Sequence, residues 1–181
     1  MNKKIKVAVI GCGRMGLHHV KAIDVVGFAD LAAVADTSAD EAQVRSSLPD
    51  AIRFYSDPAQ MLETEKPDVV HIVTPPDTHV AMARLALEHG AHIYVEKPFA
   101  LSADDARIIL DLARERGLKV CAGHQVLFQH SGQHYRRYMP ILRKVVHIES
   151  YFSFKTVRRV SGGLMDPVEQ VEDILPHPVY L

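Results

Sequence analysis

The chain has 181 residues, 48% of them hydrophobic, and a formal charge of -1 at pH 7. This length suits one domain, or one domain and part of a second, and the apolar fraction is enough for a core. The near-balance of charge argues against a nucleic-acid partner, which needs a clustered basic face. No apolar run approaches the roughly 18 residues of a membrane span, and the N-terminal stretch lacks the apolar segment of a signal peptide.

The two cysteines, Cys12 and Cys121, lie far apart in the sequence and form no C-x-x-C pair. This usage is typical of a reducing compartment, so we expect a soluble, cytoplasmic protein with no membrane partner. We also expect both cysteine side chains to be buried small apolar groups and not reactive thiols.

Apolar periodicity predicts strands that alternate with helices as far as residue 124. In chain order the expected elements are a strand over 5–10, a helix over 14–26, a strand over 31–35, a helix over 39–48, a strand over 53–55, a helix over 58–63, a strand over 68–73, a helix over 77–88, a strand over 91–95, a helix over 102–116 and a strand over 118–122. Such alternation is typical of an α/β fold, a doubly wound parallel sheet of the Rossmann type.

Capping residues mark several of the expected helix boundaries. Asp57 is placed to cap the helix over 58–63, and Ser102 with Asp105 forms a capping-box pattern. Glycines are expected to stop three helices, at Gly27, Gly90 and Gly117.

Three glycines that follow the first strand have the G-x-G-x-x-G spacing of a dinucleotide-binding turn. In this interpretation Gly11 makes the tight turn, Gly13 admits the pyrophosphate, and Gly16 lets the helix pack closely. Arg14 and Met15 begin that helix, whose unpaired N–H groups and positive dipole end would face the phosphates.

Asp36 ends the second strand, 20 residues beyond Gly16. A carboxylate at this point can accept hydrogen bonds from the ribose hydroxyls of an adenosine, and its charge would repel a 2′-phosphate. The alternative is that Asp36 begins a turn and caps the next helix. We favour the ribose role, which favours NAD over NADP as the cofactor.

Two further motifs stand at strand ends, where ligands bind in a doubly wound sheet. They are Thr74-Pro75-Pro76 and Glu96-Lys97-Pro98. A lysine beside a cationic nicotinamide in a partly desolvated cleft could exchange a proton near neutral pH, as a dehydrogenase requires. The alternative is a surface lysine paired with its neighbour. The glycine motif makes us favour the catalytic role for Lys97.

The pattern changes after residue 124. A polar helix is expected over 129–139, an antiparallel-type strand over 145–154 and a final helix over 168–175. A lone strand needs sheet partners, and the sequence offers none convincingly. We therefore predict a dinucleotide-binding Rossmann domain over 1–124 and an incomplete C-terminal α/β domain over 125–181, for substrate binding or oligomerisation.

The chain resembles the glucose–fructose oxidoreductase and inositol dehydrogenase family (Gfo/Idh/MocA) in two stretches, VAVIGCGRMGLHH and VTPPDTHVAMARLALEHGAHIYVEKPFAL. The resemblance implies a Rossmann domain followed by a domain built on an open, mostly antiparallel sheet. It implies that Lys97, the lysine of EKP, is catalytic and orients the substrate. It also places His79, the histidine of TPP-x-x-H, near the nicotinamide loop as a packing residue.

The family has a D-x-x-x-H pair on a helix of its second domain. Asp173 and His177 have this spacing, so the resemblance implies that His177 acts as acid or base and that Asp173 orients or charges it. The alternative is a capping aspartate and a chance histidine, and we favour the functional role. The chain departs from the family pattern at Pro176 and Pro178, which flank His177, and at His124 and Leu127, where the family often has asparagine and arginine.

Members of this family continue further into the second domain than this chain does. We expect either that the chain is a fragment or a truncated gene product, or that another chain supplies the missing part of the second domain. A homo-oligomer is therefore a candidate assembly.

His130 and His134 are four apart on the expected helix, but no third ligand has a supporting spacing, so we expect no metal.

These observations predict an enzyme that transfers a hydride between NAD and a secondary alcohol or ketone of a sugar, cyclitol or related polyol. Lys97 would move the proton, with His177 and Asp173 as helpers. The expected cofactor-binding residues are Gly11, Gly13, Arg14, Met15, Gly16, Asp36, Thr74, Pro75, Pro76, His79, Glu96 and Lys97. The alternative, of another class, is a dinucleotide-binding protein without turnover, either regulatory or a remnant.

Overall fold

The structure is a computed structural model, and it describes residues 3–141. The chain forms two compact units, Met1–Gly123 and His124–Leu181, which we describe separately. The strand expected over 145–154, the helix expected over 168–175 and the pair Asp173 and His177 lie outside the described residues.

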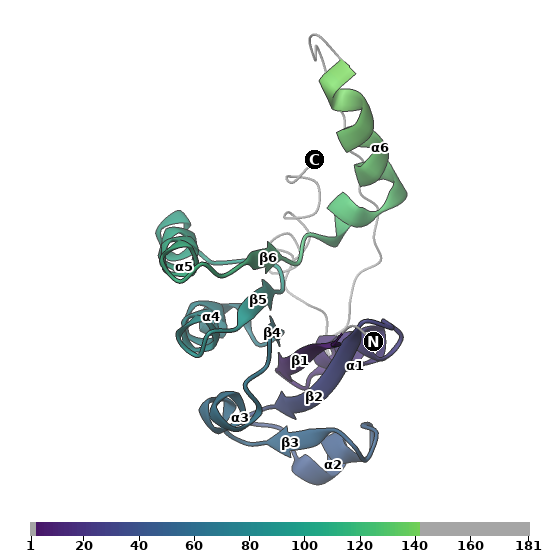
Figure 1. The fold of residues 1–181 in the computed structure, drawn as a ribbon, viewed down its shortest axis with the longest axis vertical. Coiled ribbons are helices and arrows are strands. Elements are labelled where there is room, and N and C mark those ends of the chain that lie inside the picture. Colours follow the sequence, from purple (N-terminus) through teal and green to yellow (C-terminus); the bar gives the residue numbers. More distant parts are fainter. Residues whose placement is uncertain (1–2, 142–181) are drawn as a thin grey trace, which may run out of the picture. The chain divides into compact units, whose positions relative to one another are not determined.

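The described part of the first unit contains six strands in one parallel sheet, with the order β3-β2-β1-β4-β5-β6 (Figure 1). The strands are β1 (Ile5–Ile10), β2 (Ala29–Ala35), β3 (Arg53–Tyr55), β4 (Val69–Ile72), β5 (His92–Val95) and β6 (Val120–Ala122). Strand order reverses between β1 and β4, and such a switch point leaves a crevice at the carboxyl ends of the strands. The prediction of a doubly wound Rossmann sheet is confirmed.

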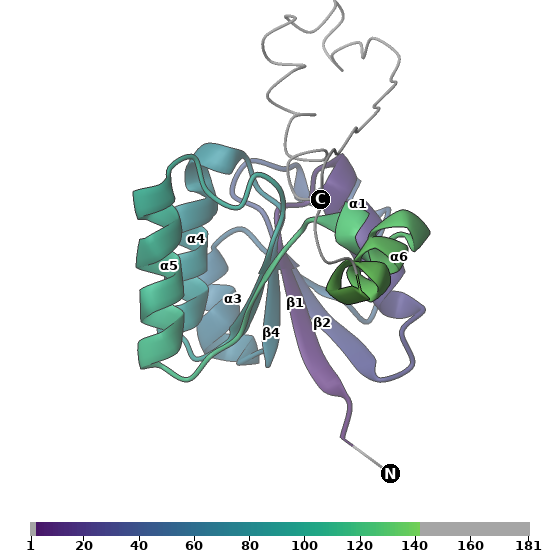
Figure 2. The same ribbon diagram turned by 90° about the horizontal axis from the view of Figure 1, so that it is seen from above.

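Helices cover both faces of this sheet. They are α1 (Arg14–Asp24), α2 (Glu41–Arg45), α3 (Pro58–Glu65), α4 (His79–Glu88) and α5 (Ala103–Glu115). Figure 2 shows α3, α4 and α5 on one face and α1 on the other. Alternate residues of β1 separate the two cores: Ala8 and Ile10 pack on the α3–α5 side, whereas Val7 and Val9 pack with Val20 of α1 on the other.

The predicted caps largely hold, with one exception. The Asp57 carboxylate accepts a hydrogen bond from Ala59 N, and Ser102 Oγ accepts one from Asp105 N. Gly90 and Gly117 take the left-handed conformation, with φ of +80° and +67°. Gly27 does not stop α1, which ends earlier, at Asp24. There Val25 stays right-handed and Val26 N donates to Ile23 O, so a tight turn ends the helix.

The cysteine prediction is correct for one residue and wrong for the other. Cys12 is buried within the glycine turn, between Gly11 and Gly13, and burial raises the pKa of its thiol to about 12. Cys121 is exposed because it lies on β6, an edge strand of the described sheet.

Glu65, at the end of α3, is a buried carboxylate with several polar partners. Its Oε2 lies 3.0 Å from Lys6 Nζ and also accepts a hydrogen bond from Arg53, and its Oε1 accepts one from the hydroxyl of Tyr55. Burial alone would raise the pKa of Glu65, but these contacts outweigh it and the pKa is lowered. The carboxylate therefore ties α3 to β1 and β3.

We expect Glu65→Ala to lower the free energy of unfolding by about 2 kcal/mol, because it removes the buried acceptor that these cations and the tyrosine share. The effect is moderate because the Lys6 and Arg53 side chains are 33% and 59% exposed and can turn to solvent. Urea unfolding measures the change, with Glu63→Ala, an exposed site on the same helix, as the control. Equal losses in the two variants would contradict the structural role of Glu65.

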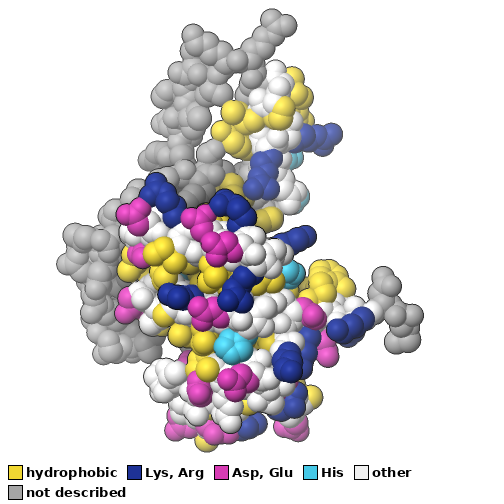
Figure 3. Space-filling model, turned by 60° about the vertical axis from the view of Figure 1, so that its left-hand side comes forward, with side chains coloured by type: hydrophobic (Ala, Val, Ile, Leu, Met, Phe, Trp, Pro, Cys, Tyr) yellow, Lys and Arg dark blue, Asp and Glu magenta, His cyan; other side chains and the backbone are white. Residues whose placement is uncertain are grey.

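The surface over α4 and α5 mixes charges of both signs, as Figure 3 shows. Ion pairs within these helices join Arg84 to Glu88, Arg107 to Asp104 and Arg114 to Asp111. This face therefore does not form the clustered basic surface that nucleic acids need. Among the described helices, none is long and apolar enough to cross a membrane.

The described part of the second unit is helical. It consists of short 3-10 turns at Gln125–Phe128 and Met139–Ile141 on either side of α6 (His130–Tyr138), which confirms the helix expected over 129–139. The Arg136 guanidinium lies 5.7 Å from the centre of the Phe128 ring. Residues 3–141 contain no group of three or more His, Cys, Asp or Glu side chains that could hold a metal ion.

Candidate functional site

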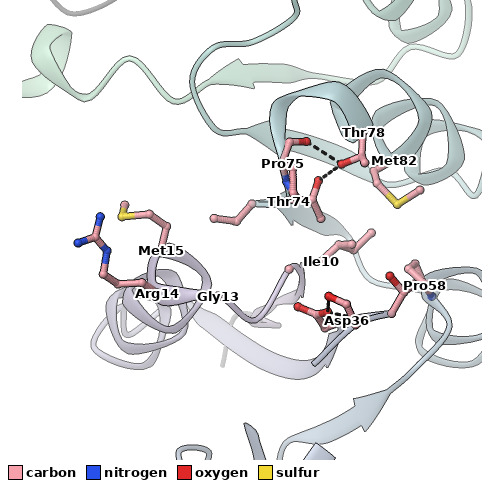
Figure 4. Close-up of a pocket in the computed structure, with 14 residues that line it drawn as sticks. Ile10, Gly13, Arg14, Met15, Asp36, Pro58, Thr74, Pro75, Thr78 and Met82 are labelled. Atoms are coloured by element: carbon pink, nitrogen blue, oxygen red, sulfur yellow. Dashed lines mark hydrogen bonds between the residues drawn. The ribbon is translucent and has the colours of Figure 1, made fainter. Parts of the chain in front are cut away.

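A pocket of about 600 Å³ opens at the carboxyl ends of β1, β2 and β4. Figure 4 shows the turn around Gly13 and Asp36 on one side of it, and Thr74 and Pro75 on the other. The lining residues are Ile10, Gly11, Gly13, Arg14, Met15, Asp36, Thr37, Ser38, Pro58, Val73, Thr74, Pro75, Thr78 and Met82. The pocket lies at the switch point of the sheet, where doubly wound folds bind ligands.

The three glycines of the turn meet different surroundings. Gly11 has a φ of +102°, and a Cβ there would lie 2.5 Å from Val73 O; a Cβ on Gly16 would lie 1.9 Å from Gly11 O. Among the described residues, no atom lies within 4 Å of a Cβ built on Gly13. Gly11 and Gly16 are thus required by the protein's own packing, whereas Gly13 leaves space open at the pocket.

Helix α1 begins at this turn with Gly13 as its N-cap. No side chain in residues 3–141 caps it, and its first turn contains no acidic residue. Arg14 and Met15 stand at its start on the rim of the pocket (Figure 4). The N-terminal N–H groups and the positive end of the helix dipole are therefore available to an anion in the pocket.

Asp36 is held in place by the backbone around it. Its Oδ2 accepts a hydrogen bond from Cys12 N at 2.7 Å, and its Oδ1 accepts bonds from Ser38 N and Ala39 N, both at 2.9 Å. Burial alone would raise the pKa of Asp36, but these bonds outweigh it and the pKa is lowered. The alternative was that Asp36 begins a turn and caps the next helix. The turn is observed, but the helix cap is not, because Asp40 caps α2. An ionised carboxylate thus lines the pocket.

The loops after β4 and β5 are joined by His79. Its ring is fully buried, with Nδ1 2.8 Å from Pro98 O and Nε2 2.9 Å from Thr74 O. Pro76, beside Pro75, begins a 3-10 turn, Pro76–Thr78, instead of lining the pocket. This geometry fits the packing role expected for His79, because the ring is closed to solvent.

Glu96 points inward, toward α1. It is 8% exposed, its Oε1 lies 3.1 Å from His19 Nε2, and its Oε2 accepts a hydrogen bond from Lys97 N at 3.1 Å. The Lys97–Pro98 peptide bond is cis, and Lys97 is half-buried. Of the expected cofactor-binding residues, the structure does not place Gly16, Pro76, His79, Glu96 and Lys97 among those that line the pocket.

Sequence reasoning missed half of the lining residues, namely Ile10, Thr37, Ser38, Pro58, Val73, Thr78 and Met82. Ile10, Thr37 and Val73 adjoin predicted motif residues at the strand ends, and Ser38 follows Thr37. Thr78 and Met82 are four apart on successive turns of helix, a spacing that puts both on one face. Pro58 carries no signal beyond its place at the first position of α3.

A glycine turn, a helix start without a side-chain cap and an ionised carboxylate at one crevice define a Rossmann-type dinucleotide-binding domain. Residues 5–124 match the family model of the oxidoreductase family with an NAD-binding Rossmann fold, Gfo/Idh/MocA. The chain belongs to this family, which confirms the resemblance seen in its sequence.

Known relatives give the match more detail. The chain is 34% identical over 120 residues to the UDP-N-acetylglucosamine 3-dehydrogenase of Acidithiobacillus ferrooxidans, an alignment that covers 66% of this chain and 37% of that protein. It is 34% identical over 119 residues to the scyllo-inositol 2-dehydrogenase (NAD(+)) of Bacillus subtilis, an alignment that covers 65% of this chain and 35% of that protein.

Solved structures agree with this placement. The crystal structure of the WlbA dehydrogenase from Bordetella pertussis, in complex with NADH and UDP-GlcNAcA, matches with a TM-score of 0.71 at 25% identity. The match covers 78% of this chain and 42% of that one. The aligned part of the chain thus spans little more than a third of these curated relatives.

Proposed function

We propose that the chain binds NAD and transfers a hydride between the nicotinamide and a secondary alcohol or ketone of a sugar, cyclitol or related polyol. The observation that carries the proposal is that one pocket brings together the glycine turn, the start of α1 and the ionised Asp36. The substrate class is supported by the relatives, whose names describe a nucleotide-sugar dehydrogenase and an inositol dehydrogenase.

The residues of the pocket fit this cofactor. The open space at Gly13 is a cradle that a Cβ would fill, and the first turn of α1 offers N–H groups to a pyrophosphate. Asp36 would accept hydrogen bonds from ribose hydroxyls, while Thr74 and Pro75 form the facing wall. When bound, the nicotinamide ring supplies the carbon that accepts or donates the hydride.

Lys97 is the proposed proton carrier. It follows β5 at the carboxyl edge of the sheet, and the inward-turned Glu96 holds its backbone N–H. In the oxidation of an alcohol, its amine would take the proton from the hydroxyl oxygen, while the carbon that bears this hydroxyl gives its hydride to the nicotinamide, so that a ketone forms. Asp173 and His177 are proposed as helpers of this proton transfer.

Fluorescence titration with NADH and NADPH tests the binding step. We expect NADH to bind at least tenfold more tightly than NADPH, because the charge of Asp36 repels a 2′-phosphate. A screen of polyols for NAD reduction then separates an enzyme from the second candidate, dinucleotide binding without turnover. Failure to bind either dinucleotide would sink both candidates.

For a polyol that the chain oxidises, Lys97→Ala is expected to lower turnover about a hundredfold, the scale of a lost general acid or base. The affinity for NADH, measured by fluorescence, should change less than about twofold, because Lys97 lies outside the pocket. The matched control is Lys119→Ala, an exposed lysine that precedes β6. Full turnover in the Lys97 variant would remove this residue from the mechanism.

A further inference from the structure

On the α1 face of the sheet, the side chains of His19, His71, Tyr94 and Glu96 meet. They come from α1, from β4, from β5 and from the residue that follows β5. His19 Nδ1 lies 2.9 Å from His71 Nδ1, and His19 Nε2 lies 3.1 Å from Glu96 Oε1. Since the His19 and Glu96 side chains are only 13% and 10% exposed, both contacts are shielded from water.

The rings of this cluster hold one another in place. His71 is stacked on Tyr94, with ring centres 4.8 Å apart and planes inclined by 21°. His19 meets both rings edge-on, at 5.2 Å from His71 and 5.3 Å from Tyr94. The orientation of His19 is thus determined by aromatic packing as well as by its hydrogen bonds.

The proton positions follow from the partners. Glu96 is an acceptor: burial alone would raise its pKa, but the bonds from His19 and Lys97 N outweigh burial and lower it. His19 therefore donates through Nε2–H. One proton lies between the two Nδ1 atoms; His71 donates it when His19 is neutral and accepts it when His19 is protonated.

The other groups that face the cluster stay neutral near pH 7. Burial lowers the pKa of His71 to about 4, with repulsion from His19 as a second cause. Burial raises the pKa of Tyr94 to about 12 and also raises that of Cys121, the neighbour of Tyr94 on β6. Glu96 is thus the charged acceptor to which this chain of hydrogen bonds leads.

We infer that His19 is a positioning residue, which fixes the backbone at Lys97 through Glu96 and is itself held by His71. The contacts run from His19 to Glu96 Oε1, and from Glu96 Oε2 to Lys97 N. His19 lies on α1, the helix whose first turn borders the cofactor pocket. The chain of contacts therefore couples the cofactor-binding helix to the proton carrier. This inference rests on the proposed function of Lys97.

Two substitutions of His19 separate its two contacts. In His19→Gln, the terminal amide can occupy the place of Nε2 and still donate to Glu96. In His19→Asn, the shorter amide reaches the place of Nδ1, keeps the contact with His71 and loses Glu96. His18→Gln is the control, because His18 is exposed and adjacent to His19 on the same helix.

Amide hydrogen exchange at Lys97, followed by NMR of the whole chain, tests the positioning without turnover. We expect exchange to become about tenfold faster in His19→Asn and to stay within about twofold of the unmodified protein in His19→Gln and His18→Gln. With a polyol that is oxidised, kcat should fall about tenfold in His19→Asn and recover in His19→Gln, while NADH affinity changes less than about twofold.

Equal exchange rates at Lys97 in the asparagine and glutamine variants would overturn the inference, whether both rates were faster than in the unmodified protein or unchanged. If the His19 variants do not fold, Glu96→Ala is the second variant. It removes the carboxylate that accepts the Lys97 N–H, so Lys97 exchange must rise if the inference holds. Absence of turnover with intact exchange differences would refute the proposed function and leave the positioning in place.

Discussion

A Gly16→Ala variant is expected to lose about 3 kcal/mol of unfolding free energy, whereas Gly13→Ala should keep its stability and lose dinucleotide binding. The methyl group on residue 16 would lie 1.9 Å from Gly11 O and 2.9 Å from Gly11 C. Both atoms belong to the backbone of a tight turn and cannot rotate away. Helix α1 would have to move from the sheet, together with its buried Val20 and Ile23.

Gly13 differs from Gly16 because the space around it is open. Its φ is -65° and its ψ is -174°, an extended conformation that alanine adopts freely. With no described atom within 4 Å of the added Cβ, the free energy of unfolding should change by less than about 1 kcal/mol. A bound pyrophosphate would meet the new methyl group, so NADH affinity should fall at least tenfold.

Urea unfolding and NADH fluorescence on the same two proteins check this pair of expectations. The informative result is the separation of the two effects, since both substitutions add one methyl group to the same turn. If Gly13→Ala bound NADH normally, the pyrophosphate would not approach residue 13. If Gly16→Ala were fully stable, the close packing of α1 on the turn would be wrong.

The sheet and the pocket edge were predictable because their signals are local. Apolar runs gave the strands, and the glycine spacing with Asp36 at the end of β2 placed the ligand edge. Errors at the ends of elements have local causes too. Asp40 accepts hydrogen bonds from Ala42 N and Gln43 N, so α2 begins after it and not at residue 39.

The inward orientation of Glu96 could not be predicted in this way. Its partner His19 is 77 residues away in the sequence, and no periodicity links the two. The sequence motif suggested a side chain in the cofactor pocket, whereas the folded chain offers it a histidine on α1. The hydrogen-bond partners of His79 could not be predicted either. They are backbone carbonyl groups, which every residue has, so no residue type in the sequence indicates them.

The two buried glutamates show how position in the sheet separates stability from function. Glu65 contacts Lys6 near the start of β1, remote from the pocket, and its exposed cationic partners suit a structural tie. Glu96 stands at the opposite edge, with a histidine as its partner and the backbone of Lys97 as its other contact. Variants of Glu65 should change only the free energy of unfolding, and variants of Glu96 should also change the amide exchange at Lys97.

Between about pH 7 and pH 4, a His71→Phe variant is expected to lose roughly 3 kcal/mol less unfolding free energy than the unmodified protein. Burial lowers the pKa of His71 from 6.5 to about 4 in the folded chain. The unfolded state therefore binds the proton more readily in this range, and unfolding becomes easier as the pH falls. The stability that depends on a neutral His71 is complete above about pH 6.5 and is lost by about pH 4.

Phenylalanine cannot take up this proton, and its ring can keep the stacking on Tyr94. Urea unfolding at several pH values should give a curve of stability against pH that is flatter for the variant in this range. Its absolute stability at pH 7 is not the test, because the contact with His19 is lost. The lowered pKa values of Asp36, Glu65 and Glu96 make both proteins less stable at still lower pH. Parallel curves for the two proteins would show that His71 accepts a proton equally well when the chain is folded.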